Sequence, residues 1–568
     1  MSATWTLRQA EPAANAPAEV DISAAAAHAP DLADLLRRRG IVSAAERAAF
    51  LSPSVADLHD PLGLLGMSRA VDLLMAARER EECVAVVGDY DVDGITSTAL
   101  LLGLFRAVGI RCEGILPNRH DGGYGLQPRH VAEAHRLGCR LLVTADCGIL
   151  AHAAIAAAGA IDLPVIVTDH HLPGPEPLPA AAVVNPRQKE CTYPFKDLAG
   201  VGLALKLAAA VLARLGREIP WPALCRIACL GTIADAAPLV GENRVLASVG
   251  LAALPATPSV GLLALMAEAE VGVPVRAYDV GFRLGPRLNA AGRLGAADPA
   301  LELLLTRDPA RAKELARQLG EWNVERRALE RKVLDDCAER FASQPLPGIL
   351  VGWSENWHRG VVGIAAGRLA REFHRPAVLF AVENGVAVGS GRSVPGLDLH
   401  GFLERWQTSC ERFGGHAQAV GMTVLAANLS GLAAEWKEAA TRFPEHQLAE
   451  TFEYDGDLPL AEVSAERIQE LARLEPFGMG NPEPVFRFSP CSVAGPPRTF
   501  GNGHLGFLVR SGAESLEVVA WGWGARQSLF QPGAGNRFEM LASLEHDNYR
   551  NRPRLRLIDA RTMSPQTN

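Results

Sequence analysis

The chain has 568 residues, which is too long for one hydrophobic core and indicates two to four domains. Hydrophobic residues make up 48% of it and charged residues 21%, a globular composition that excludes fibrous and disordered proteins. The formal net charge of −8 argues against a broadly basic surface for nucleic acid, so any site for a polyanion must be local.

The ends and the cysteines point to a cytoplasmic protein. The sequence opens without the basic and apolar regions of a signal peptide, and no apolar run is long enough to span a bilayer, so we expect no membrane contact. The ten cysteines are scattered, and the pair Cys225 and Cys229 has no second pair to complete a zinc site. We interpret the cysteines as reduced thiols.

The first half of the chain alternates between strand and helix patterns. Residues 1–20 predict a flexible arm, and helical patterns follow at 31–50 and 67–78. Short apolar runs, each followed by a helical stretch, then occur at Val84–Val87, Leu141–Val143, Val165–Val167 and Ala181–Val184. This alternation predicts an α/β fold with a doubly wound parallel sheet.

The second half predicts a long helix, a smaller α/β lobe and a barrel. Residues 309–342 are charged and helical, residues 349–424 repeat the α/β pattern, and the short strands after a helix at 465–474 suit a small β-barrel. We therefore expect an arm at 1–20, a first domain with N-terminal helices at 21–305, a connecting helix at 306–343, a second lobe at 344–445 and the barrel at 446–568.

Three acids at alternate positions form the strongest local motif. Residues 88–94 read Gly-Asp-Tyr-Asp-Val-Asp-Gly, directly after a hydrophobic strand. An EF-hand loop begins in a similar way, but Leu100 stands where its bidentate glutamate belongs and no helix precedes it. A solvated turn is the alternative. Because three close carboxylates repel each other, Asp89, Asp91 and Asp93 are better explained as cation ligands.

The next strands end in similar residues. Asp146 follows one strand, and Asp169, His170 and His171 follow the next. A lone aspartate after a strand is commonly a helix cap, but the carboxyl ends of parallel strands meet at one edge of a sheet, which brings these groups together. Asp235 lies between small apolar residues, where a ligand role is more economical than a buried free acid. A ligand set made only of oxygens suits Mg²⁺, whereas the addition of an imidazole shifts the preference toward Mn²⁺.

These motifs resemble those of the DHH phosphoesterase superfamily, and in spelling and order its RecJ family of single-stranded-DNA-specific exonucleases. The resemblance extends over nearly the whole chain from residue 30 onward. It implies two divalent ions, Mn²⁺ or Mg²⁺, bridged by Asp146 and by a water. It further implies that Asp169 and His171 orient the ligands or contact the phosphate. The other metal ligands that it implies are Asp89, Asp91, Asp93, His170 and Asp235.

Arginines in glycine-rich segments are candidate phosphate contacts. Arg119 follows another strand pattern, and Arg287 lies two residues before Asn289. A guanidinium group binds phosphate bidentately, and an asparagine can contact a sugar or a base edge. The alternatives are a solvated loop arginine at Arg119 and a helix cap at the other two positions.

The later segments offer further contacts. The second lobe resembles the DHHA1 domain, and its phosphate-binding candidates are His358, Ser390, Arg392 and His416. The C-terminal segment resembles an OB-fold, in which a basic and aromatic mixture suits a single-strand groove, although a charged edge strand is the alternative. Its candidate residues for the path of the strand are Phe500, Tyr549, Arg550, Arg552 and Arg554.

The resemblance implies a metal-dependent exonuclease that shortens single-stranded DNA from the 5′ end to 5′-mononucleotides, in DNA repair and recombination. The partners it implies are single-stranded DNA, a single-strand-binding protein and a helicase. The alternatives are a DHH-family hydrolase of short oligonucleotides or cyclic dinucleotides, and a catalytically silent nucleic-acid-binding scaffold. The extra barrel counts against the first alternative, and the retained ligands count against the second.

Overall fold

The computed structural model describes residues 3–9, 29–117, 125–342, 346–532, 537–547 and 549–563. They form two compact units, the first comprising Met1–His59, Ala236–Val249 and Thr451–Asn568, and the second Asp60–Asp235 and Gly250–Glu450. Within the described ranges no single helix is long and apolar enough to cross a membrane. One bent pair of helices, Gly241–Ala256 with Val260–Glu268, meets the same criteria of length and composition.

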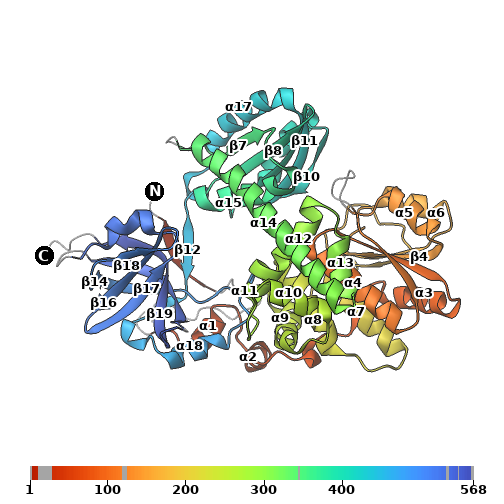
Figure 1. Ribbon diagram of the computed structural model, residues 1–568, viewed down its shortest axis with the longest axis horizontal. Coiled ribbons are helices and arrows are strands. Elements are labelled where there is room, and N and C mark those ends of the chain that lie inside the picture. Colours follow the sequence, from red (N-terminus) through yellow and green to blue (C-terminus); the bar gives the residue numbers. More distant parts are fainter. Residues whose placement is uncertain are drawn as a thin grey trace. The chain divides into compact units, whose positions relative to one another are not determined.

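A five-stranded parallel sheet lies in the first lobe of the second unit (Figure 1). Its order is β3 (Arg111–Ile115), β2 (Cys83–Gly88), β4 (Cys139–Ala145), β5 (Val165–Thr168) and β6 (Ala182–Val184), with every neighbouring pair parallel. All six residues of β2 are buried, which explains its continuous apolar run. The predicted parallel sheet is confirmed.

Helices cover both faces of this sheet, as a doubly wound fold requires. On one face a shared core joins the strands to α5 (Pro128–Arg136) and α6 (His152–Gly159). On the other lie α3 (Met67–Glu79), α4 (Val92–Ala107) and α7 (Gly200–Arg214). The helical remainder of this lobe comprises α8 (Trp221–Ala234), α10 (Val260–Glu268), α11 (Ala277–Asp279), the π-helix η5 (Val280–Leu284), α12 (Gly285–Leu294) and α13 (Asp298–Leu305). Most of α9 (Gly241–Ala253) belongs to the first unit.

A single long helix, α14 (Pro309–Arg340), leads to the second lobe of the same unit. The lobe has a mixed sheet in the order β10 (Arg412–His416), β11 (Ala419–Leu425), β9 (Val386–Arg392), β8 (Ala377–Glu383) and β7 (Leu350–Ser354). Only β7 and β8 are parallel. Helix α15 (Arg359–Phe373) packs on β8 and β9, and α17 (Leu429–Ala439) contributes Leu432 and Trp436 to the core on the other face.

The first unit contains a closed barrel of five strands. These are β14 (Phe486–Val493), β16 (His504–Ser511), β17 (Glu514–Ala520), β18 (Phe538–Asp547) and β19 (Arg552–Thr562), closed by pairing of β14 with β16. The barrel core also takes in Leu35 of α1 (Leu32–Arg37) and Phe50 beside it in α2 (Ala44–Leu51). The N-terminal strand β1 (Thr4–Leu7) pairs in parallel with β12 (Thr451–Tyr454).

The OB-like barrel is therefore confirmed, whereas the domain boundaries expected from the sequence stay predictions. The helical pattern at 31–50 proves to be two helices. Gly40, with a φ of +78°, lies where the first has ended, and Ser43 caps the second by accepting a hydrogen bond from the Glu46 N–H.

Candidate metal centre

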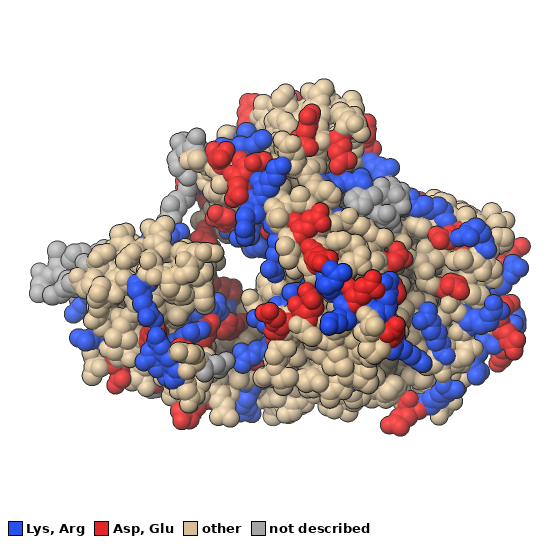
Figure 2. All heavy atoms as spheres, in the orientation of Figure 1, with Lys and Arg blue, Asp and Glu red and all other residues tan. Residues whose placement is uncertain are grey.

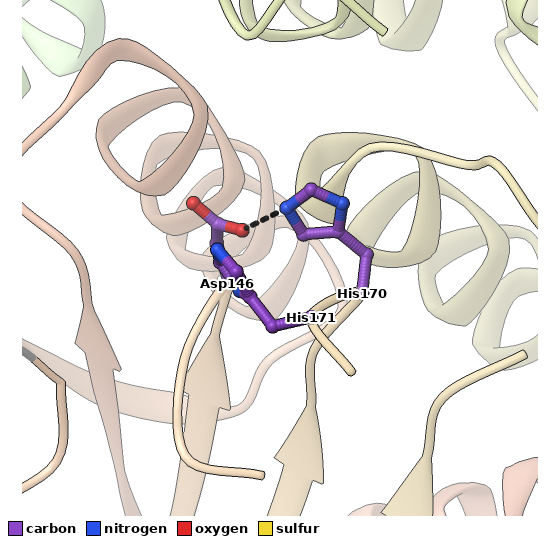
Figure 3. A group of neighbouring side chains, drawn as sticks. All are labelled: Asp146, His170 and His171. Carbon is purple, nitrogen blue, oxygen red and sulfur yellow. Dashed lines mark ion pairs between the residues drawn. The ribbon is translucent and has the colours of Figure 1, made fainter. Parts of the chain in front are cut away.

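The acidic residues found in the sequence converge at the carboxyl edge of the parallel sheet. Three groups of residues could each hold a metal ion, because within each group the ligand atoms lie within 4.8 Å of one another. They are Asp89 with Asp91 and Asp146, Asp93 with His170 and Asp235, and Asp146 with His170 and His171. Asp146 and His170 belong to two sets each. Figure 3 shows the His170 ring directed at the Asp146 carboxylate.

Asp146 occupies the centre of this cluster in a strained backbone conformation. It is 2% exposed, with a φ of 65°, the left-handed region that non-glycine residues rarely adopt. Its Oδ1 lies 3.2 Å from His170 Nε2. A Cβ on Gly200 would lie 2.4 Å from the same oxygen, so only glycine allows α7 to approach this closely.

The N-terminus of α7 holds Asp93. The N–H groups of Gly200 and Val201 donate to its two carboxylate oxygens at 2.7 and 2.8 Å. A helix N-terminus stabilises an anion through these free N–H groups and the helix dipole. We did not predict these donors from the sequence. The available signal was the small-residue opening of an apolar helix at residues 199–202.

Asp169 orients His171 and the neighbouring loop. One of its oxygens accepts from the Ile149 N–H at 2.9 Å, and the other accepts from the His171 N–H and lies 2.7 Å from His171 Nδ1. Burial raises the pKa of Asp169, but the hydrogen bond and charge of His171 outweigh it and leave that pKa lowered. Burial lowers the pKa of His171, and its bond to Asp169 reverses this, raising the pKa to about 9.

His170 is arranged as a neutral ligand. Its Nε2 lies 3.2 Å from Asp146, 3.8 Å from Asp235 and 3.9 Å from Asp93. Burial, and next the positive charge of His171, lower its pKa to about 4. A neutral imidazole is the form that binds metal ions.

The aspartates of this cluster destabilise one another's charged forms. Burial, followed by the charges of Asp235 and Asp91, raises the pKa of Asp93 well above its usual value. The pKa of Asp146 is raised by burial and then by Asp93, and that of Asp235 rises to about 7 through burial and Asp91. Crowded acids of this kind call for cations.

The donor set fits divalent metal ions. Asp146 Oδ1 is buried and, in the described part of the chain, accepts no hydrogen bond. An orphaned buried oxygen is expensive unless a ligand satisfies it. Carboxylate oxygens with one or two imidazoles suit Mn²⁺ or Mg²⁺.

The predicted phosphate contacts of the first domain have different surroundings. Arg119 lies outside the described residues. Arg287 donates to the carbonyls of Arg283 and Glu268 at 2.9 and 3.2 Å, so two of its N–H groups hold the backbone. Asn289 lies inside α12 and is half-buried, so it does not cap that helix. The roles proposed for these three stay predictions.

Three of the candidates of the second lobe, His358, Ser390 and Arg392, lie at the first turns of α15. His358 caps the helix by accepting from the Gly360 N–H at 3.1 Å. On the adjacent strand Arg392 donates to Ser390 Oγ at 2.9 Å, and a Cβ on Gly363 of α15 would lie 2.8 Å from that oxygen. Burial and then the charges of Arg392 and His171 lower the pKa of His416. The effect of His171 indicates that His416 lies near the carboxylate edge.

The candidate arginines of the barrel are ion-paired. Arg550 and Arg552 both contact Glu517, and Arg554 lies 3.1 Å from Glu545. Tyr549 is 95% exposed. Phe500 belongs to an exposed aromatic cluster, with ring centroids 5.6 Å from His504 and 5.8 Å from Trp521.

Comparison with known proteins identifies each part of the chain. Residues 83–232 match the DHH family N-terminal domain, residues 346–441 the DHHA1 domain and residues 454–559 the RecJ OB domain. The fold and the carboxylate edge thus define a phosphoesterase of the DHH family.

Relatives over the full length narrow this class. Single-stranded-DNA-specific exonuclease RecJ of Bacillus subtilis is 36% identical over 94% of this chain and 68% of the relative, and that of Dickeya dadantii 37% identical over 93% and 96%. The crystal structure of RecJ in complex with Mn²⁺ from Thermus thermophilus has a TM-score of 0.83 and 31% identity, covering 99% of this chain and 80% of that one. The chain belongs to the RecJ family.

Proposed function

We propose that this protein is a metal-dependent exonuclease that hydrolyses single-stranded DNA from the 5′ end to 5′-mononucleotides, acting in DNA repair and recombination. Membership of the RecJ family, whose relatives are named single-stranded-DNA-specific exonucleases, supports the reaction and the substrate. The observation that carries the proposal is the convergence of five aspartates and His170 at the carboxyl edge of one sheet.

Two divalent ions, Mn²⁺ or Mg²⁺, are the cofactors that suit this edge. Solved RecJ structures contain each of these ions. We assign Asp146 to both ions, because its carboxylate belongs to two of the ligand sets, and we assign the remaining ligand positions to Asp89, Asp91, Asp93, His170 and Asp235. When bound, the ions supply a water with a pKa near about 7 and positive charge for the phosphate.

The protein side chains position the reacting groups. The N–H groups of Gly200 and Val201 hold Asp93, and Asp169 holds His171, so the ligands are oriented before substrate arrives. Arg392, the capped end of α15 at His358, and His416 provide donors for a terminal phosphate. A strand whose end is held there has its first phosphodiester at the carboxylates, which yields mononucleotides.

Strandedness and partners follow from the same arrangement. A site that binds the end of a strand cannot bind circular DNA, which has no end. We also propose that duplex DNA must be unwound by another protein before it is hydrolysed. A helicase and a single-strand-binding protein are therefore the protein partners we propose, with the cytoplasm as the compartment.

The test compares 5′-labelled, 3′-labelled, duplex and circular DNA of one sequence with Mn²⁺, sampled early, together with cyclic dinucleotides. We expect labelled mononucleotide from the 5′-labelled linear strand first, with the circle intact. Cleavage of the circle would show an endonuclease, early mononucleotide from the 3′ label would reverse the polarity, and preferential loss of cyclic dinucleotides would replace the substrate. The surface variant Asp72→Asn serves as an unaffected control.

A further inference from the structure

Two aromatic rings are stacked on the surface of the first lobe, outside the carboxylate edge. Tyr278 of α11 and Phe282 of η5 have ring centroids 4.8 Å apart at 24°. They are 61% and 63% exposed. Two adjoining exposed rings make a small apolar patch with an aromatic face, which is the kind of surface that can meet a ligand.

The backbone beneath the pair is rigid and unusual. η5 is a π-helix, a form that recurs at functional sites, and its residues Val280 and Leu284 are fully buried. Because these two residues face the core, Tyr278 and Phe282 are held outward. The pair therefore stands on a helical segment that is anchored in the core.

The same segment packs against the end of α8 that carries a metal-ligand candidate. A Cβ on Gly281 would lie 3.8 Å from Ile233, and one on Gly285 would lie 3.4 Å from Ala234. These two residues immediately precede Asp235. The rings therefore lie on the segment that packs against the part of α8 directly preceding Asp235.

Two arginines occur in the same segment as the rings. Arg276 lies two residues before Tyr278, and Arg283 directly follows Phe282. Arg283 contacts Asp279 at 3.5 Å, whereas Arg276 is exposed and has no ion pair with any residue that the structure describes. Exposed aromatic rings with arginines in the same segment are a combination that suits a phosphodiester chain that carries bases.

We propose that Tyr278 and Phe282 form a stacking platform for a base of the single strand, beyond the nucleotide that is cleaved. This inference rests on the proposed function, since it assigns part of that enzyme's substrate to the platform. Stacking on a ring tolerates any base, so the platform strengthens binding without sequence preference. It acts only on strands long enough to reach it.

The test is the double variant Tyr278→Ala with Phe282→Ala, assayed with Mn²⁺ on a 12-nucleotide strand and on a dinucleotide. We expect KM for the 12-mer to rise about tenfold with kcat within about twofold, and the dinucleotide kinetics to stay unchanged. Exchanging the rings, Tyr278→Phe with Phe282→Tyr, should keep the parental KM. Val273→Ala removes apolar surface nearby without an aromatic face and should have no effect.

Binding without catalysis separates this inference from the proposed function. Fluorescence anisotropy of a labelled 12-mer in EDTA should show the same rise of about tenfold in Kd for the double variant. A double variant that keeps the parental Tm, Kd and KM would overturn the platform. A parent that binds the 12-mer but never hydrolyses it would overturn the proposed function, while the Kd comparison would still decide the platform.

Discussion

The carboxylate edge of the parallel sheet and the arginine strand of the barrel both place like charges at two-residue intervals, but their surroundings differ. Around Asp93 and Asp146 the neighbouring charges are mainly further carboxylates, and their pKa values are raised by burial and by these neighbours. In the barrel, Glu517 contacts Arg550 and Arg552. Burial raises the pKa of Glu517, but the hydrogen bonds from these two arginines outweigh it and leave that pKa lowered.

The difference shows that a run of charge in a sequence does not by itself identify a ligand site. The carboxylates need cations from outside the chain, whereas the arginines of β19 are largely neutralised within the barrel by Glu483, Glu517 and Glu545. Figure 2 likewise shows blue and red side chains intermixed over the visible face. We therefore propose that the aromatic cluster, rather than these arginines, is the main DNA contact of the barrel.

Removing metal is expected to have the largest effect. EDTA should abolish hydrolysis, since the proposed mechanism uses a water activated by the bound ions, and Mn²⁺ should restore it. Mn²⁺ at about 100 times its Kd should also stabilise the fold by about 2.7 kcal/mol for each ion bound, measured by denaturant unfolding. Full activity in EDTA would contradict the proposal that the carboxylate edge, unlike the arginines of the barrel, needs cations from outside the chain.

Gly200→Ala tests how tightly the carboxylate edge is built. The new Cβ would lie 2.4 Å from Asp146 Oδ1, so either the helix or the ligand must shift, and we expect turnover to fall more than tenfold, or about 1.4 kcal/mol. Gly103→Ala, in open space on α4, is the matched control and should keep full activity. Equal turnover in the two variants would show that this approach is not critical.

Two barrel variants compare aromatic and basic contacts. Phe500→Ala should raise the Kd for a 30-nucleotide strand about tenfold, because stacking contributes about 1–3 kcal/mol per base. Arg552→Gln should raise it only about twofold, since that arginine already contacts Glu517. Anisotropy titrations at two salt concentrations measure both effects, and the reverse ranking would restore the arginines as the main contact.

The pH dependence of the barrel gives the smallest effect. The pKa of Glu517 is lowered in the fold, so its contribution is present above its ordinary value of 4.5 and is lost as pH falls through the folded value. The free energies of unfolding of the parent and Glu517→Gln should therefore differ above about pH 5, by at most about 1 kcal/mol after solvent screening, and converge toward pH 3. Glu514→Gln on the same strand should match the parent throughout.

Much of the fold and the metal-ligand candidates could be predicted because their signals are local. Asp146 and Asp169 directly follow apolar strands, and parallel strands bring such positions to one edge. The hydrogen bond from Gly200 to Asp93 joins residues 107 apart, and no local pattern reports it. The pairing of Glu517 with Arg552 likewise depends on β17 lying beside β19, which the alternation of arginines does not reveal.

The most direct test of the metal centre is the number of Mn²⁺ ions bound per chain, measured by calorimetry beside turnover for the parent and Asp146→Asn. We predict two ions in the parent, and in the variant the loss of at least one ion with turnover reduced more than a thousandfold, about 4 kcal/mol. A variant that binds two ions and keeps turnover within about tenfold of the parent would contradict the assignment of Asp146 to both ions.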